Sequence, residues 1–423
     1  MVMGSIIPVA VPFLRRHPRL MALARSLHFR IWYLRVRINA RLWSENLDVN
    51  QTYWINPDKI EYACILDKLG VYSTWGDRGK VIGGNWDQKR IRFTELDIFR
   101  AFEDRFIRGR RWEETEFYQR VLNMISNGKV PWWCKNKAEL DERCRYLDFL
   151  FQDIKTNGYR AQQEIAQEEN TSLKGEDEIT VRIGRDGALL FENGRHRLAI
   201  AKLLNIDNIP IKVTAKHSEW YQFRKELIDY AREQGGKLYH PVTHPDLRDI
   251  PAAYGEERFE LIKAHLPIRG GNLLDIGANL GYFCHKFEEE GFNCYAVESD
   301  APNRYFLEKL KIAENRKFKI IYGSIFDYRD TTDFDVVLAL NIFHHFIKAE
   351  GTYYKLIDLL KRLDMKVMFF QAELPDSPQM KGAYRNFNCD EFVDFILENS
   401  KLNEAMCIGE TKDGRPIYRL QAV

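Results

Sequence analysis

Residues 271–300 constrain the fold of this chain more than any other stretch. They contain, in order, an apolar run, a glycine turn, a helix-like run, a second apolar run and an acidic end: residues 272–276, 277–281, 282–290, 293–297 and 298–300. A short apolar run bounded by turn residues is typical of a buried strand. Strand, glycine turn, helix, strand and acid are the parts of a mononucleotide-binding half of a doubly wound parallel sheet. We therefore expect an α/β fold with a nucleotide-like ligand at the turn.

The turn, Asp275-Ile-Gly-Ala-Asn-Leu-Gly281, resembles motif I of the class I S-adenosylmethionine (SAM) methyltransferases. The resemblance implies a SAM site made of the motif residues and of one acid after the second strand, which would hold the ribose: Asp275, Gly277, Asn279, Gly281 and Glu298. The main alternative is a nicotinamide dehydrogenase. That class has Gly-x-Gly-x-x-Gly at this point, whereas the turn here reads Gly-x-x-x-Gly.

The segments that follow extend the resemblance to roughly residues 254–423. Apolar runs predict three further parallel strands, at residues 318–322, 334–340 and 366–372. After the first of them, Gly-Ser-Ile-Phe-Asp stands where the family often has an acid that holds the adenine amino group. Ser324 replaces that acid, so the resemblance implies that Ser324 or Asp327 serves instead, beside Ile325.

The second of these strands is an unbroken apolar run, as expected of a central parallel strand. It ends at Leu340 and Asn341, and the loop that follows, with His344 and His345, resembles motif IV of the family. Ligands bind at the carboxyl ends of such strands, so Leu340 and Asn341 should meet the methionine end of the cofactor. An imidazole titrates near neutral pH, so His344 or His345 could take a proton from a hydroxyl acceptor. The alternative is that one histidine packs under the loop and the other only shapes the pocket.

The end of the chain separates the two families. Residues 405–409 and 416–420 predict two strands joined by a tight turn at Lys412-Asp-Gly-Arg415. A terminal hairpin of this kind resembles the antiparallel seventh strand of class I methyltransferases, which dehydrogenases lack. The resemblance therefore implies SAM as the cofactor.

Residues 171–220 resemble a second family. Their apolar runs predict strands at residues 179–183, 188–191 and 209–213, and Gly194-Arg195-His196-Arg197 opens a helix between the last two. Unpaired amides, the helix dipole and two guanidinium groups favour an anion there. The unit resembles the ParB/sulfiredoxin-type domain, which implies a phosphate or nucleotide at these four residues. The alternative is that the arginines form structural ion pairs, for example with Glu192.

The first fifty residues are basic. Eight arginines lie between Arg15 and Arg41, no acid precedes Glu45, and leucines and isoleucines recur at helical spacing. Basic amphipathic helices can lie on anionic membranes or bind other polyanions. The alternative is a helix packed on the protein with its arginines in solvent.

Length and composition set the domain plan. A chain of 423 residues predicts about three domains. We expect a basic segment, a mostly helical tryptophan-rich region, a small α+β ParB-like domain, a linker and a methyltransferase domain: residues 1–50, 51–170, 171–220, 221–253 and 254–423. The seven cysteines are scattered without C-x-x-C, which favours reduced thiols in the cytoplasm. No metal-ligand pattern is present, so no metal is expected.

Together these patterns predict a SAM-dependent methyltransferase. We expect O-methylation of a small molecule, glycan or phosphorylated metabolite, with the ParB-like site holding a phosphate or nucleotide group. One alternative is an RNA methyltransferase that uses the basic N-terminus. The other is a non-catalytic nucleotide sensor or membrane adaptor with an inactive methyltransferase fold.

Overall fold

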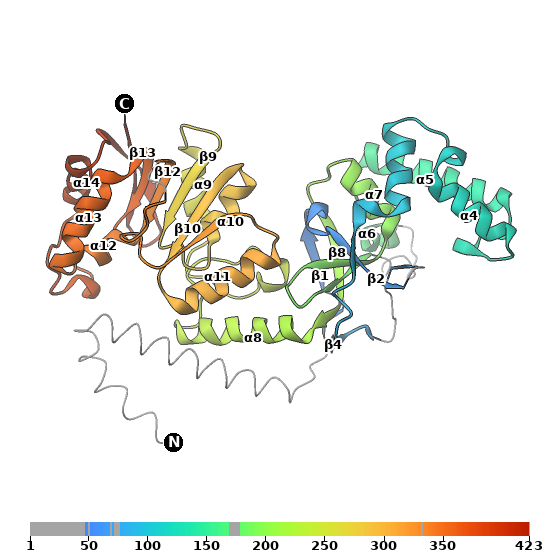
Figure 1. Ribbon diagram of the computed structural model, residues 1–423, viewed down its shortest axis with the longest axis horizontal. Helices are drawn as coiled ribbons and strands as arrows, with labels where there is room; N and C mark the ends of the chain where they lie inside the picture. Colours follow the sequence, from blue (N-terminus) through green and yellow to red (C-terminus); the bar gives the residue numbers. More distant parts are fainter. Residues whose placement is uncertain are drawn as a thin grey trace, which may run out of the picture. The chain divides into compact units, whose positions relative to one another are not determined.

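The computed structural model describes residues 47–49, 51–67, 70–71, 77–168, 178–330 and 333–422. The described residues form two compact units, one ending at Arg224 and the other beginning at Lys225. The basic segment expected at residues 1–50 lies almost wholly outside the described residues. Figure 1 shows the elements of both units.

The C-terminal unit is built on a seven-stranded sheet. Its strands lie in the order β11 (Lys319–Tyr322), β10 (Phe292–Glu298), β9 (Gly271–Ile276), β12 (Asp333–Leu340), β13 (Asp364–Gln371), β15 (Pro416–Gln421) and β14 (Glu404–Glu410). The first five are parallel, and β15 is antiparallel to both of its neighbours. The expected Rossmann-like sheet and its terminal hairpin are therefore confirmed.

Helices cover both faces of this sheet (Figure 1). On one face lie α9 (Glu257–Ala264), α10 (Tyr282–Glu289) and α11 (Ala301–Ala313), whose apolar side chains join one core cluster. On the other lie α12 (Phe343–Phe346), α13 (Glu350–Arg362) and α14 (Cys389–Asn399), which join a second cluster. Burial on both faces explains why the central strands read as apolar runs without alternation.

Two segments before α9 also pack on this unit. From Lys225 onward, α8 (Ser218–Glu233) contacts α11, where the Tyr230 hydroxyl donates to Asn303 Oδ1 at 2.7 Å and the Tyr305 hydroxyl donates to Glu226 Oε2 at 2.5 Å. The chain after α8 folds back on itself, because Leu238 N–H donates to Pro251 O at 2.8 Å. This return places Tyr239 beside the sheet.

The N-terminal unit contains its own sheet. Among the described residues its path is β1-β8-β6-β7-β2-β3, with β4 beside β8 and β5 beside β2. The strands are β1 (Thr52–Ile55), β2 (Tyr62–Asp67), β3 (Gly70–Val71), β4 (Lys80–Ile82), β5 (Arg90–Arg92), β6 (Ile179–Ile183), β7 (Leu189–Asn193) and β8 (Ile209–His217). The helices are α3 (Asp97–Phe102), α4 (Glu116–Ser126), α5 (Lys137–Asn157), α6 (Gln162–Glu168) and α7 (Arg195–Leu203).

Two features of this unit differ from the sequence expectations. Strands from residues 52–92 pair with those from residues 179–217, so the expected boundary between residues 170 and 171 runs through one sheet. Within the region expected to be mostly helical, α3 runs into a π-helical turn, Glu103–Ile107, and the chain then turns at Gly109, which has φ 71°. A new helix, α4, then begins after Thr115, whose side chain accepts from Tyr118 N–H.

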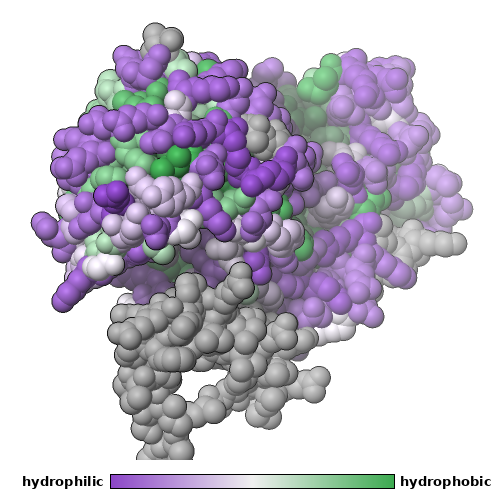
Figure 2. Space-filling view, turned by 60° about the vertical axis from the view of Figure 1, so that its left-hand side comes forward, coloured by the Kyte–Doolittle hydropathy of each residue, from purple (hydrophilic) through white to green (hydrophobic). Residues whose placement is uncertain are grey.

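Figure 2 shows hydrophilic side chains over most of the face turned forward, with apolar side chains in scattered patches. Among the described residues, no helix has the length and apolar character needed to span a bilayer.

Candidate functional site

The turn between β9 and α10 brings the backbone close to a cavity. Gly277, Asn279 and Gly281 all have positive φ, at 81°, 53° and 83°. A Cβ on Gly277 would lie 2.9 Å from Ile342, and a Cβ on Gly281 would overlap Leu307. Only glycine fits both positions, because each combines left-handed backbone with a close neighbour.

Glu298, the last residue of β10, faces this turn. Its Oε2 accepts from Asn279 N–H at 2.8 Å, and its Oε1 accepts from Asp300 N–H at 2.7 Å. Burial raises the pKa of Glu298, and the two backbone N–H groups oppose that rise. The Asn303 side chain is a further hydrogen-bond partner of this carboxyl group. An ionised carboxylate has about four acceptor positions, so at least one remains for a ligand.

A cavity of about 280 Å³ opens at the carboxyl ends of β9, β10 and β12. Among its lining residues are eight that the sequence indicated: Gly277, Asn279, Glu298, Ser324, Ile325, Leu340, Asn341 and His345. It is also lined by residues that the sequence did not indicate, including Tyr239, Ser299, Asn303, Ile342 and Phe346. The strand ends therefore bring most of the expected cofactor residues together.

Four of the expected residues do not line this cavity. Asp275 is buried behind the turn, where burial raises its pKa to about 7 and Cys284 Sγ lies 3.9 Å away. Gly281 begins α10, and Asp327 lies beyond Ile325. His344 points away from the cavity into the protein, as described below.

Asn341 is held from three sides at the carboxyl end of β12. Its Nδ2 donates to the Tyr239 hydroxyl at 2.7 Å, and its Oδ1 accepts from Arg415 Nη1 at 3.0 Å. Its N–H donates to Gln371 O at 2.8 Å, and its φ is 57°. A left-handed asparagine held by several partners is typical of a functional loop.

Behind Tyr239 lies a buried arginine that the sequence did not indicate. Arg258 is 0% exposed, and its Nη1 donates to the Tyr239 hydroxyl at 3.3 Å. Its guanidinium stacks over the Tyr254 ring with 3.6 Å from Cζ to the ring centroid. Its Nε and Nη2 have no hydrogen-bond partner among the described residues. Burying an unpaired cation is costly, so this position suits an anionic ligand group.

The two histidines of α12 have different surroundings. His344 is 3% exposed, burial lowers its pKa to about 2, and neither ring nitrogen has a hydrogen-bond partner among the described residues. His345 lines the cavity, and its Nδ1 lies 3.3 Å from Lys348 Nζ. Burial also lowers the pKa of Lys348. His345 is therefore the histidine placed to meet a substrate.

The Gly194–Arg197 motif lies in the N-terminal unit, in the first turn of α7. Gly194 has φ 89°, and a Cβ there would lie 3.0 Å from Ile179 Cα. His196 stacks on Phe102 and meets the edge of Trp132, and burial lowers its pKa to about 3. We expected all four residues to face an anion, whereas this imidazole is neutral and packed among aromatic rings.

The arginines of the motif have a basic environment. Burial lowers the pKa of Arg195, and the charges nearby are Asp97 and Arg120. The positive charges of Arg195, Arg143 and Arg197 also contribute to the low pKa of His196. Among the described residues whose charges act on Arg195 and His196, cations therefore outnumber acids.

No protein-family model matches this chain, and no curated protein matches it. Solved structures align with it in part. The bifunctional kinase-methyltransferase WbdD aligns with a TM-score of 0.37 and 20% identity, over 46% of this chain and 46% of WbdD. A SAM-dependent methyltransferase from Clostridium acetobutylicum aligns with a TM-score of 0.31 and 12% identity, over 39% of this chain and 89% of that chain.

The N-methyltransferase NodS from Bradyrhizobium japonicum aligns with a TM-score of 0.32 and 15% identity, over 40% of this chain and 94% of NodS. The aligned part covers about half of the length of WbdD. Every TM-score is below 0.5 and every identity below 25%, so these likenesses say nothing of the substrate.

Proposed function

We propose that the C-terminal unit binds SAM in the cavity beside Glu298 and is a SAM-dependent methyltransferase. The observation that carries the proposal is that Glu298, the glycine turn and Asn341 line one cavity at the carboxyl ends of three parallel strands. Ligands of doubly wound sheets bind at this edge. A nicotinamide enzyme is disfavoured by the turn sequence and by the antiparallel β15.

The cavity residues fit the nucleoside half of SAM. The remaining acceptor capacity of Glu298 can take a hydrogen bond from a ribose hydroxyl. Ile325 and Val297 offer apolar faces for a purine, and Ser324 lies beside them as a polar partner. This set gives a specific but small number of polar contacts, as is usual for cofactor sites.

The buried cation fits the amino-acid half. The carboxylate of a ligand near Tyr239 would accept a hydrogen bond from the tyrosine hydroxyl. It would also approach the nitrogens of Arg258 that have no partner among the described residues. The Tyr239 hydroxyl already accepts from Asn341 and from Arg258, so its own proton is directed elsewhere. Charge-assisted bonds of this kind are stronger than neutral ones.

SAM supplies a methyl group on a sulfonium, which transfers by in-line displacement. The chain then has to hold the acceptor atom in line and exclude water, which is mainly a matter of orientation. Asn341 and Tyr239 hold the loop edge where the acceptor would arrive. His345 would accept the proton of an acceptor hydroxyl, since it is the histidine that faces the cavity.

For the acceptor, we propose a hydroxyl on a small molecule, glycan or phosphorylated metabolite. Lys348 supports an anionic acceptor, because it lies beside His345 and forms no ion pair among the described residues. We further propose that Arg195 and Arg197, in a ParB-like unit, bind a phosphate or nucleotide group. Their support is the excess of cations around the start of α7.

The acceptor proposal is tested by methyl transfer from SAM labelled in its methyl group. Purified protein is incubated with separate cell fractions that contain small metabolites, glycans or RNA. We expect label in the metabolite or glycan fraction, stable to base treatment that cleaves methyl esters. Label in RNA alone would contradict the proposed acceptor class and favour the RNA methyltransferase.

A further inference from the structure

The seven-stranded sheet has an open edge at β11. Among the described residues, β11 pairs only with β10, through four parallel residue pairs from Lys319 to Tyr322. The backbone N–H and C=O groups on the other side of β11 are therefore open to an additional strand. Natural proteins usually cover or block such an edge, because it is a template for pairing.

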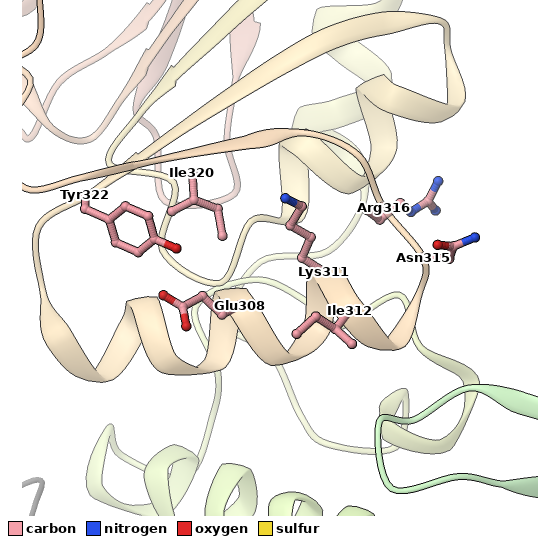
Figure 3. A pocket seen from close by; sticks show the side chains of 7 residues that line it. All are labelled: Glu308, Lys311, Ile312, Asn315, Arg316, Ile320 and Tyr322. Carbon is pink, nitrogen blue, oxygen red and sulfur yellow. The ribbon is translucent and has the colours of Figure 1, made fainter. Parts of the chain in front are cut away.

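A second cavity, of about 420 Å³, lies between this edge strand and α11. Figure 3 shows Ile320 and Tyr322 of β11 projecting toward α11, which carries Glu308, Lys311 and Ile312. Ile312 is 58% exposed and Tyr322 is 65% exposed. Two large apolar side chains thus stand exposed beside unpaired strand backbone.

Several lysines lie along this strand and in the residues before it, although Glu308 also lines the cavity and Lys319 lies on the opposite face of the sheet. The lysines of residues 309–319 form no ion pair among the described residues, and they are Lys309, Lys311, Lys317 and Lys319. Two of them are held over aromatic rings, with 5.6 Å from Lys311 Nζ to the Phe318 centroid and 5.1 Å from Lys319 Nζ to the Tyr295 centroid. Arg316, by contrast, is paired with Glu289 and Glu314.

We propose that the edge of β11 binds an acidic, extended segment of a partner protein as an added strand. A strand presents alternate side chains to opposite faces. Every second side chain of the added strand would lie over the cavity, where an apolar residue would cover Ile312 and Tyr322. The intervening acidic residues would lie on the other face of the sheet, on the side of Lys319, whose Nζ lies over the Tyr295 ring. Backbone hydrogen bonds would supply affinity, as in other cases of strand addition.

The same charges disfavour two other occupants. A second copy of this chain, paired edge to edge about a two-fold axis, would bring the lysines of both copies together. A nucleic acid would satisfy the lysines, but it has no N–H and C=O ladder for the strand edge. An acidic strand from a partner protein would use the strand edge, the cavity and the positive charge together. It is therefore the occupant that we test.

The probe is a fluorescein-labelled octapeptide that alternates glutamate with valine or phenylalanine, added to the full-length protein. Binding is followed by fluorescence anisotropy. A peptide with lysine in place of each glutamate should bind at least about tenfold more weakly, since the charge complementarity is reversed. Two N-methylated peptides then test whether the peptide forms backbone hydrogen bonds with β11. Each peptide carries methyl groups on every second backbone nitrogen, and the two patterns block hydrogen bonding on opposite edges of the peptide strand. Only one of these two patterns should abolish binding.

Two variants of the protein locate the site. Lys319→Glu should weaken binding of the acidic peptide by roughly tenfold or more, because it places like charge on the face of the sheet where the glutamates of the added strand would lie. Lys361→Glu, on the exposed surface of α13, should leave binding unchanged and controls for net charge. The proposal is overturned if the wild type does not bind the acidic peptide at concentrations up to about 1 mM. It is also overturned if both N-methylation patterns weaken binding equally, or if a single-stranded RNA is bound in preference and Lys319→Glu abolishes that binding.

Discussion

Glu298 Oε2 accepts a hydrogen bond from the backbone N–H of Asn279 at 2.8 Å. This contact ties the acid at the end of β10 to the glycine turn after β9, two segments that are about twenty residues apart in the chain. It also orients the carboxylate, which is 6% exposed and lines the cavity. The position of the proposed ribose acceptor is therefore set by the fold before any ligand arrives.

Arg258 provides a test of where the methionine end of SAM lies. Arg258→Met should weaken the binding of S-adenosylhomocysteine by about 10- to 150-fold, since hydrogen bonds to charged groups contribute about 1.5–3 kcal/mol. It should leave 5′-methylthioadenosine almost unaffected, because that molecule has no carboxylate. Calorimetric titration of both ligands measures the difference. Equal loss of both would mean that the substitution disturbs the whole cavity, and no loss would remove Arg258 from the site.

Substitutions of the two adjacent histidines, His344 and His345, should have different effects on kcat. With an acceptor from the labelling experiment, His345→Ala should lower kcat by about 10²- to 10⁴-fold, the usual contribution of a general base. His344→Asn should change the melting temperature more than kcat, because the buried imidazole stays neutral at working pH. The pH profile of kcat should lose its acidic limb only in His345→Ala. A larger rate loss in His344→Asn would reverse the assignment.

The arginines at the start of α7 should act independently of the SAM cavity. Arg195→Ala combined with Arg197→Ala should weaken binding of ATP or pyrophosphate by at least about tenfold, given the strength of charge-assisted bonds. Affinity for S-adenosylhomocysteine should not change. Wild-type protein that binds neither anion, or a variant that loses both kinds of ligand equally, would contradict a separate phosphate site.

Asp275 should make the stability of the protein fall as pH rises. Its pKa is raised by burial from 3.8 to about 7, so between these values the folded chain holds a proton that the unfolded chain releases. The stabilisation is complete below about pH 4 and is lost as pH rises toward the folded pKa of about 7. Asp275→Asn should therefore raise the free energy of unfolding at pH 8, by at most about 4 kcal/mol, since one pKa unit corresponds to about 1.4 kcal/mol.

Asp335 is the matched control for this prediction. Its hydrogen bond from Lys366 lowers its pKa, so its stabilisation is present at neutral pH and is lost as pH falls. Asp335→Asn should therefore lower the melting temperature at pH 8, whereas Asp275→Asn should raise it. Melting curves of the full-length protein at pH 8 should show these two opposite changes in melting temperature. At pH 5 the gain from Asp275→Asn should be smaller than at pH 8. A lower melting temperature in both variants at pH 8 would mean that the folded protein is stabilised by the ionised form of Asp275.

The sequence was sufficient for the C-terminal sheet, because its central strands are buried on both faces and read as unbroken apolar runs. It also indicated Glu298 and Asn341, since they stand directly after such runs. It did not indicate Tyr239 and Arg258. Tyr239 comes from a segment without a strand pattern, and it reaches the cavity only because the chain after α8 turns back at Leu238. Arg258 lies on α9 and contacts Tyr239, and no sequence pattern indicates that contact.

The strands of residues 52–92 were missed for another reason. They are two to six residues long, as in β3 (Gly70–Val71) and β5 (Arg90–Arg92). Their charged side chains give no clear alternation, and some of their pairing partners lie more than one hundred residues later, as for Lys80 and Ala215. Likewise, two adjacent histidines cannot be told apart by pattern, because the orientation of the short helix α12 decides which one faces the cavity.

The most direct test of the central proposal is calorimetric titration of the full-length protein with S-adenosylhomocysteine. The wild type should bind with a Kd of about 1–100 μM, and Glu298→Ala should bind about 10- to 150-fold more weakly. Glu288→Ala is the control, because Glu288 also accepts backbone N–H groups, from Lys317 and Phe318, but lies outside the cavity. It should bind like the wild type. A folded wild type that does not bind, or equal loss in the two variants, would contradict a SAM site at Glu298.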